Sequence, residues 1–190
     1  MIDKKSTYHR KNSLRLQGYD YSSEGVYFIT IGTKNRISHF GKVTHDKVLL
    51  SDSGKIVAEE WNKTPQVRKE VILGEWVIMP NHFHALVAFK SLEEIAGSSS
   101  VSADGHPRVL GEISNYKNAF GRQSKNLSAL VRSFKASCTS RIRNKVNPDF
   151  GWQRSFHDRI VRSQKELERI EDYIFENPLK FSLTNNSTIN

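Results

Sequence analysis

The sequence has little of several features that would mark particular classes of protein. Cysteine occurs once in 190 residues, at Cys138, so neither an intrachain disulfide nor a cysteine metal cluster is available. The first ten residues are polar, and no apolar run approaches the roughly 18 residues of a membrane-spanning helix. Walker A, Gly-x-Gly-x-x-Gly and Cys-x-x-Cys motifs are also missing. We therefore expect a cytoplasmic protein without a membrane anchor.

Positive charge is what the sequence has in excess. Lys and Arg number 29 against 20 acidic residues, which gives a formal net charge of +9. This surplus favours a polyanionic partner, with nucleic acid as the first candidate, although charge alone does not separate it from anionic lipid or simple solubility. The length and the 37% hydrophobic content indicate one domain with a substantial core.

Two histidines on a predicted strand form the first candidate site. Residues 75–89 are two apolar, β-prone runs joined at Pro80-Asn81, which predicts a hairpin. Residues two apart on a strand face the same way, so His82 and His84 share one face and can hold a cation. The opposite face carries apolar side chains suited to a core: Phe83, Ala85, Val87 and Phe89. For a His-x-His pair alone, two partly buried structural histidines are the bland interpretation.

A predicted helix near the other end of the chain carries the second candidate site. Residues 163–178 begin with a Ser-x-x-Glu capping box and end against Pro178, which indicates a short helix. Its apolar stripe is Leu167, Ile170 and Ile174. Tyr173 and Asn177, four residues apart, therefore share an adjoining face. Each residue alone would suit an ordinary amphipathic helix.

The remaining segments complete an α+β pattern. Strands are expected at 26–31, 39–43, 48–50 and 152–160, and helices at 52–63 and from Leu127 to Ile142. Strand, helix, two strands, helix, strand is the split β-α-β order of ferredoxin-like folds. We expect one domain over residues 18–183, with a flexible insertion loop at 91–122. A basic arm over 1–17 and a polar tail over 184–190 would flank it.

Four blocks, in the right order over roughly residues 10–181, resemble one known family. Pro80 to His84 matches a His-hydrophobic-His motif, and Asp172 to Lys180 matches a Tyr-Ile-x-x-Asn-Pro-x-Lys block. Residues 18–30 and 152–162 agree as well. The chain resembles the single-tyrosine HUH (IS200-like) transposases, most closely the REP-associated tyrosine transposases.

The resemblance implies a fold, a chemistry and a partner. The fold would be ferredoxin-like, an antiparallel sheet with helices packed on one face. Tyr173 would attack DNA and form a covalent phosphotyrosine, with Mg²⁺ or Mn²⁺ held by His82, His84 and Asn177. The substrate would be single-stranded DNA, with a flanking hairpin or palindromic REP-like repeat. The protein would work as a monomer or a homodimer, and the same site would carry out strand transfer.

Two other functions stay open from the sequence. One is a catalytically silent DNA-binding or repressor protein of the same fold. The other is a metal nuclease that activates water, in which Tyr173 is only structural. A neighbouring pair, His157 and Asp158, is a weaker candidate for ligation or acid-base chemistry, because such a pair is more often a structural hydrogen bond.

Overall fold

A four-stranded antiparallel sheet is the centre of the computed structural model, which describes residues 25–44, 47–90 and 126–186, with side chains to residue 183. The strand order is β4 (Val71–Met79), β5 (His82–Phe89), β1 (Gly25–Gly32) and β6 (His157–Val161). Helices α1 (Asp52–Asn62) and α4 (Leu127–Lys145) make the two crossovers. This is the split β-α-β order, so the predicted α+β, ferredoxin-like fold is confirmed. The expected arm at 1–17 and loop at 91–122 lie outside the described residues.

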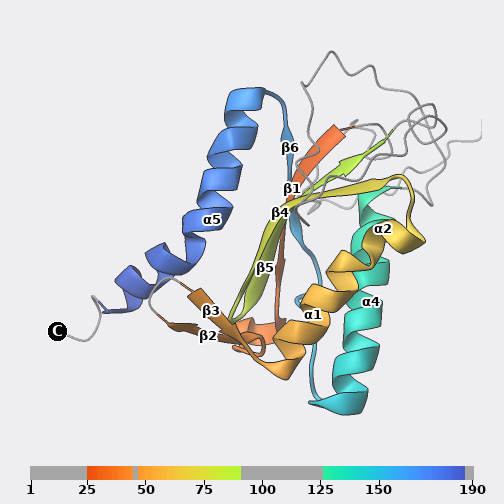
Figure 1. Ribbon diagram of the computed structural model, residues 1–190. Coiled ribbons are helices and arrows are strands. Elements are labelled where there is room, and N and C mark those ends of the chain that lie inside the picture. The colour runs from red at the N-terminus through yellow and green to blue at the C-terminus, as the bar shows by residue number, and fades with distance from the viewer. Residues whose placement is uncertain (1–24, 45–46, 91–125, 187–190) are drawn as a thin grey trace, which may run out of the picture.

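Helices α1 and α4 cover one face of the sheet, together with the short α2 (Thr64–Val67) (Figure 1). Ser51 caps α1 by accepting a hydrogen bond from the Gly54 amide, and Asn126 caps α4 in the same way. The core under them centres on Trp61, which meets the rings of Phe83 and Phe134 at centroid distances of 5.0 and 5.1 Å. The predicted apolar residues of α4 are all buried: Leu127, Leu130, Val131, Phe134, Cys138 and Ile142.

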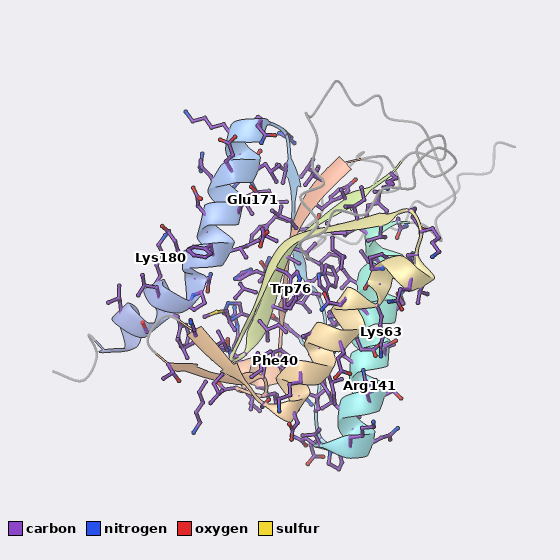
Figure 2. All side chains as sticks on the ribbon, viewed as in Figure 1. Phe40, Lys63, Trp76, Arg141, Glu171 and Lys180 are labelled. Carbon is purple, nitrogen blue, oxygen red and sulfur yellow. The ribbon has the colours of Figure 1, made fainter. Side chains whose placement is uncertain are left out.

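Arginine joins the two crossover helices at their surface. Arg141 of α4 donates to carboxylate oxygens of Glu59 and Glu60 of α1, with both distances 2.6 Å (Figure 2). The charge of Arg141 is therefore committed to holding α1 against α4. It is not available to a polyanion.

The last helix, α5 (Gln164–Asn186), lies on the opposite face of the sheet (Figure 1). Its buried residues are the predicted stripe of Leu167, Ile170 and Ile174, which packs on a second cluster that includes Leu86 of β5. The expectation that helices pack on one face therefore holds for α1 and α4 only. The sheet has apolar side chains on both faces, and α5 covers the one that the crossovers leave open.

The expected end of this helix at Pro178 is wrong, because α5 continues through that residue to Asn186. Proline lacks the amide hydrogen that would bond to Ile174, and its ring crowds the preceding turn, so a bend is expected rather than a stop. Figure 1 shows α5 changing direction in its lower half. The amino-terminal start is as predicted, since Ser163 Oγ accepts a hydrogen bond from the Glu166 amide.

Two further segments shape the end of the sheet where β5 begins. A 3₁₀ turn, η1 (Lys34–Arg36), follows β1, and a hairpin of β2 (Gly41–Thr44) and β3 (Lys47–Leu50) follows the turn. The strand expected at 152–160 is shorter than predicted, because β6 begins only at His157. Trp152 instead forms an isolated bridge with Thr33, and Lys135 Nζ donates to the carbonyl of Gln153 at 2.6 Å. These contacts divert residues 152–156 from the sheet edge.

Candidate active site

Strand β5 presents its two histidines to the face that α5 covers. Their ring centroids are 4.7 Å apart, while Phe83 between them is fully buried under α1 and α4. His84 is 5% exposed, and His82 is less buried. In the sheet register His84 lies opposite Thr30 and His82 lies opposite Gly32. The prediction that the pair shares one face is confirmed, and His84 sits deeper than His82.

Strand β1 fixes the ring of His84 from two directions. Its Nδ1 is 2.8 Å from Oγ1 of Thr30, and its ring stacks on Phe28 with a centroid distance of 5.3 Å. The other nitrogen, Nε2, lies 3.4 Å from the hydroxyl oxygen of Tyr173. The imidazole therefore has one nitrogen committed to the sheet and one directed at the tyrosine.

Asn81 fixes the tautomer of His82. The amide nitrogen of Asn81 donates to the carbonyl of Arg36 at 3.2 Å, so its carbonyl oxygen faces Nδ1 of His82 at 2.7 Å. A carbonyl oxygen only accepts, so Nδ1 must carry the proton and Nε2 keeps its lone pair. Metal-binding histidines are usually held in this way, by an acceptor on the nitrogen that does not bind metal.

The turn that holds Asn81 has an unusual backbone. Asn35 and Arg36 both have positive φ values, 55° and 57°, which side chains other than glycine adopt at a cost of about 1–3 kcal/mol each. This conformation aims the Arg36 carbonyl at Asn81. The strain is thus located where it orients His82.

Burial keeps both imidazoles neutral at physiological pH. It lowers the pKa of His82 to about 4 and, with help from the charges of His82 and Arg36, the pKa of His84 to about 3. The positive charge of Arg36 also lowers the pKa of His82. Neutral imidazoles are the form that binds a metal ion, whereas a base of such low pKa accepts a proton poorly near pH 7.

Helix α5 places Tyr173 over this pair and Asn177 one turn further along. Tyr173 is 39% exposed, and its ring meets His84 and Phe28 at centroid distances of 5.4 and 6.0 Å. Asn177 is only 8% exposed, although it is polar and flanks a proline. A nucleophile open to solvent and a buried amide on one helix suit a reacting group and a supporting group.

The donor set suits a divalent ion of borderline hardness. Two neutral imidazole nitrogens with fixed rings supply a pair of ligands, and a buried amide oxygen on the adjoining helix offers a third. No group of three or more His, Cys, Asp or Glu side chains that could hold a metal occurs within the described residues. Any third protein ligand there must therefore be a weaker one, such as Asn177.

The structure sets His157 apart from this centre. His157 pairs with Thr30, which pairs in turn with His84, so the two histidines lie on one row of the sheet with β1 between them. Two strand spacings make about 10 Å, too far for both to bind one ion. Sequence reasoning missed Phe28 and Thr30 as contacts of His84, and Asn81 as the residue that orients His82.

Comparisons with known proteins agree with this architecture. No family model matches the sequence. An uncharacterized protein of Haemophilus influenzae is 33% identical over 171 residues, which cover 90% of this chain and 89% of that protein. None of the helices in the described ranges is long and apolar enough to cross a membrane.

Solved structures show the fold. The structure of a REP-associated tyrosine transposase bound to a REP hairpin is similar with a TM-score of 0.55 and 20% identity, over 86% of this chain and 72% of that one. A candidate transposase from Deinococcus radiodurans R1 reaches a TM-score of 0.44 and 14% identity, over 84% and 94%, and we rest nothing on it. The resemblance recognised in the sequence is thus confirmed in the fold. The chain belongs to one family with the Haemophilus influenzae protein and has the fold of the REP-associated tyrosine transposase.

Proposed function

We propose that the protein is a transposase that cuts single-stranded DNA through a covalent phosphotyrosine and rejoins it by strand transfer. The observation that carries this proposal is the contact between Tyr173 and His84, 3.4 Å between the hydroxyl oxygen and Nε2. A structural tyrosine on an amphipathic helix has no need of a buried, neutral imidazole beside its hydroxyl. The fold shared with a tyrosine transposase supports the same assignment.

Tyr173 is the nucleophile in this proposal. Its oxygen attacks the scissile phosphorus, the bond from phosphorus to the 3′-oxygen breaks, and the DNA 5′-phosphate stays on the tyrosine. The phenol loses its proton and the leaving 3′-oxygen gains one. The phosphotyrosine ester keeps the energy of the broken bond, so attack by another 3′-hydroxyl rejoins DNA without ATP.

His82, His84 and Asn177 would hold a divalent ion, Mg²⁺ or Mn²⁺. Such an ion polarises the scissile phosphate and favours the charge that builds up during the attack. Thr30 and Asn81 hold the two rings with Nδ1 turned away from the site, and burial keeps both rings neutral. The low pKa of His84 favours this ligand role over direct proton abstraction from Tyr173.

The proposed substrate is a DNA strand beside a hairpin of REP type. The similar transposase structure holds a REP hairpin, and the net charge of +9 suits a nucleic acid. Tyr173 lies beside a histidine of its own chain, which supports a site completed within one subunit. A monomer would then be sufficient for cleavage.

A covalent adduct is the decisive measurement. Labelled single strands from the DNA that flanks the coding region are incubated with Mn²⁺ and separated on denaturing gels. The wild type should retain label on the protein, and Tyr173→Phe should retain none, because this change deletes only the hydroxyl oxygen. Tyr27→Phe is the matched control and should form the adduct, since Tyr27 is fully buried on the other face of the sheet.

The other two functions give different gels. A water-activating nuclease would yield free products with metal, and Tyr173→Phe would leave its cleavage intact. A silent DNA-binding protein would shift the DNA on native gels and leave it uncut. Either result with wild-type protein at saturating DNA and Mn²⁺ would overturn the proposal.

A further inference from the structure

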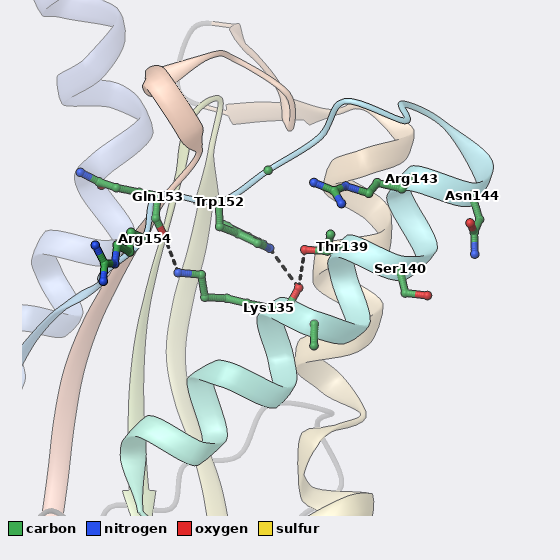
Figure 3. A pocket seen from close by; sticks show the side chains of 10 residues that line it. Lys135, Thr139, Ser140, Arg143, Asn144, Trp152, Gln153 and Arg154 are labelled. Carbon is green, nitrogen blue, oxygen red and sulfur yellow. Dashed lines mark hydrogen bonds between the residues drawn. The ribbon is translucent and has the colours of Figure 1, made fainter.

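A basic groove lies beside the candidate active site, between α4 and the segment that precedes β6. Its volume is about 580 Å³, and it is lined by Lys135, Thr139, Ser140 and Arg143 of α4 and by residues 151–154. Figure 3 shows Arg143 on one side of Lys135 and Arg154 on the other. None of the lining residues, all of which lie in the described part of the chain, is acidic.

The walls of the groove are fixed by hydrogen bonds that leave cationic groups over. Lys135 Nζ donates to the Gln153 carbonyl at 2.6 Å, and the Trp152 indole donates to the Lys135 carbonyl at 3.2 Å. Arg143 uses only its Nε, which donates to the Phe150 carbonyl at 2.8 Å. Its terminal amino groups are left for another acceptor. This differs from Arg141, two residues earlier, which is paired with two glutamates.

The groove continues onto the histidine face of the sheet at Gln153. The Gln153 amide donates to the Gly32 carbonyl at 2.8 Å, and Gly32 is the register partner of His82. A Cβ on Gly32 would lie 2.8 Å from Oε1 of Gln153, so this side chain lies over the even-numbered face of β1, where Phe28 contacts His84. Two strand spacings, about 10 Å, separate the backbones of Gln153 and His82.

Turn η1 adds cations between the two places. The Arg36 charge is close enough to lower the pKa of both His82 and His84. Lys34 lies on the groove side, where its Cδ would be 3.5 Å from a Cβ on Gly151. Positive charge therefore runs without a break from the histidine pair to the groove.

We propose that the groove between α4 and Gly151–Arg154 binds the phosphodiester backbone of the DNA strand that continues from the scissile phosphate. Arg143 and Arg154 supply the main phosphate contacts, and the hydroxyl and amide groups of Ser140, Asn144 and Gln153 supply neutral donors. The groove contacts read no base and set the register of the strand over Tyr173. This inference rests on the proposed function for its substrate and concerns a separate surface.

Salt dependence of binding tests the groove. Labelled oligodeoxythymidylate is titrated with protein over a salt series, which gives the slope of log affinity against log salt. Each lost phosphate contact to a single strand lowers that slope by about 0.7, so Arg143→Gln/Arg154→Gln should lower it by about 1.4. The matched control, Lys63→Gln/Lys69→Gln, removes two exposed charges near the far end of α1 and should keep the wild-type slope.

Arg154→Gln alone guards against misfolding, because Arg154 is exposed and its loss should lower the slope by about 0.7 without a change in thermal unfolding. An unchanged slope in both arginine variants would overturn the groove proposal and leave the covalent adduct assay untouched. Conversely, a lowered slope in a protein whose wild type forms no adduct would support the groove and overturn the proposed transposase. The two failures are therefore distinguishable.

Discussion

The Tyr173 hydroxyl lies 3.4 Å from Nε2 of His84, although 89 residues separate the two in the chain. The contact exists because α5 packs its apolar stripe on the same face of the sheet that carries the even-numbered residues of β5. Nδ1 of His84 is bonded to Thr30, so Nε2 is the nitrogen that faces the tyrosine. A metal ion bound there would sit next to the nucleophile and to any phosphate that it attacks.

Replacement of either histidine by alanine should separate catalysis from binding. His82→Ala and His84→Ala each remove one of two imidazole ligands, so we expect metal-dependent cleavage to fall below detection. DNA affinity should change little, because phosphate contacts are spread over many basic residues. Cleavage gels and native gels on the same DNA measure the two properties. If both variants cleave at the wild-type rate with saturating Mg²⁺, the metal role of the pair is wrong.

Asn81 should affect metal affinity without touching the metal. Asn81→Ala removes the acceptor for the Nδ1 hydrogen of His82, and loss of such a partner usually weakens metal binding by about 10–100-fold. Titration calorimetry with Mn²⁺ measures the change. Asn62→Ala, at the exposed end of α1, is the control and should bind Mn²⁺ as the wild type does. Wild-type affinity in Asn81→Ala would reduce Asn81 to a turn residue.

The sequence predicted the site residues better than it predicted their support. Strand periodicity placed His82 and His84 on one face, and helix periodicity placed Leu167, Ile170 and Ile174 in the core. Both patterns are local, so they survive without knowledge of the fold. Thr30 and Phe28 contact His84 only through the register of β1 with β5, and no pattern within one segment encodes that register.

The errors in the fold prediction also arise from tertiary contacts. Pro178 should end a helix in isolation, yet α5 continues because one missing hydrogen bond does not outweigh packing on both sides of the bend. Residues 152–156 have strand-like composition, but Trp152 turns toward Phe40 and Phe134 of the core and Lys135 binds the following carbonyl. Propensity lost to packing in both cases.

Stability should fall in mild acid because of the buried histidines. The folded-state pKa of His84 is about 3, below the unfolded value of 6.5, so below pH 6.5 the unfolded state binds more protons. The stabilisation is complete above about pH 6.5 and is lost as the pH falls toward the folded pKa, by about 3 kcal/mol for His84 at pH 4. Urea unfolding in EDTA between pH 7 and about pH 4.5 measures the slope. His84→Gln should flatten it, whereas His157→Gln, which changes an exposed histidine, should not.

Asn177 should behave as a weak ligand whose strength can be raised. Asn177→Ala removes the amide oxygen, and we expect weaker Mn²⁺ binding and slower adduct formation. Asn177→Asp replaces the amide by a carboxylate, which is a better ligand for Mn²⁺ and completes a two-histidine, one-carboxylate set. A purely structural Asn177 predicts a different pattern. Burying a carboxylate at a site 8% exposed would then destabilise the protein and give no gain in Mn²⁺ affinity.

Calorimetry with Mn²⁺, together with urea unfolding in EDTA, separates the two patterns for Asn177. The ligand role requires Asn177→Asp to bind Mn²⁺ more tightly than the wild type even if the metal-free protein is less stable. Asp172→Asn removes an exposed carboxylate beside Tyr173 and should leave Mn²⁺ affinity unchanged. If Asn177→Ala and Asn177→Asp both bind Mn²⁺ as the wild type does, the histidine pair works without this residue. The third ligand must then come from water or from the DNA phosphate itself.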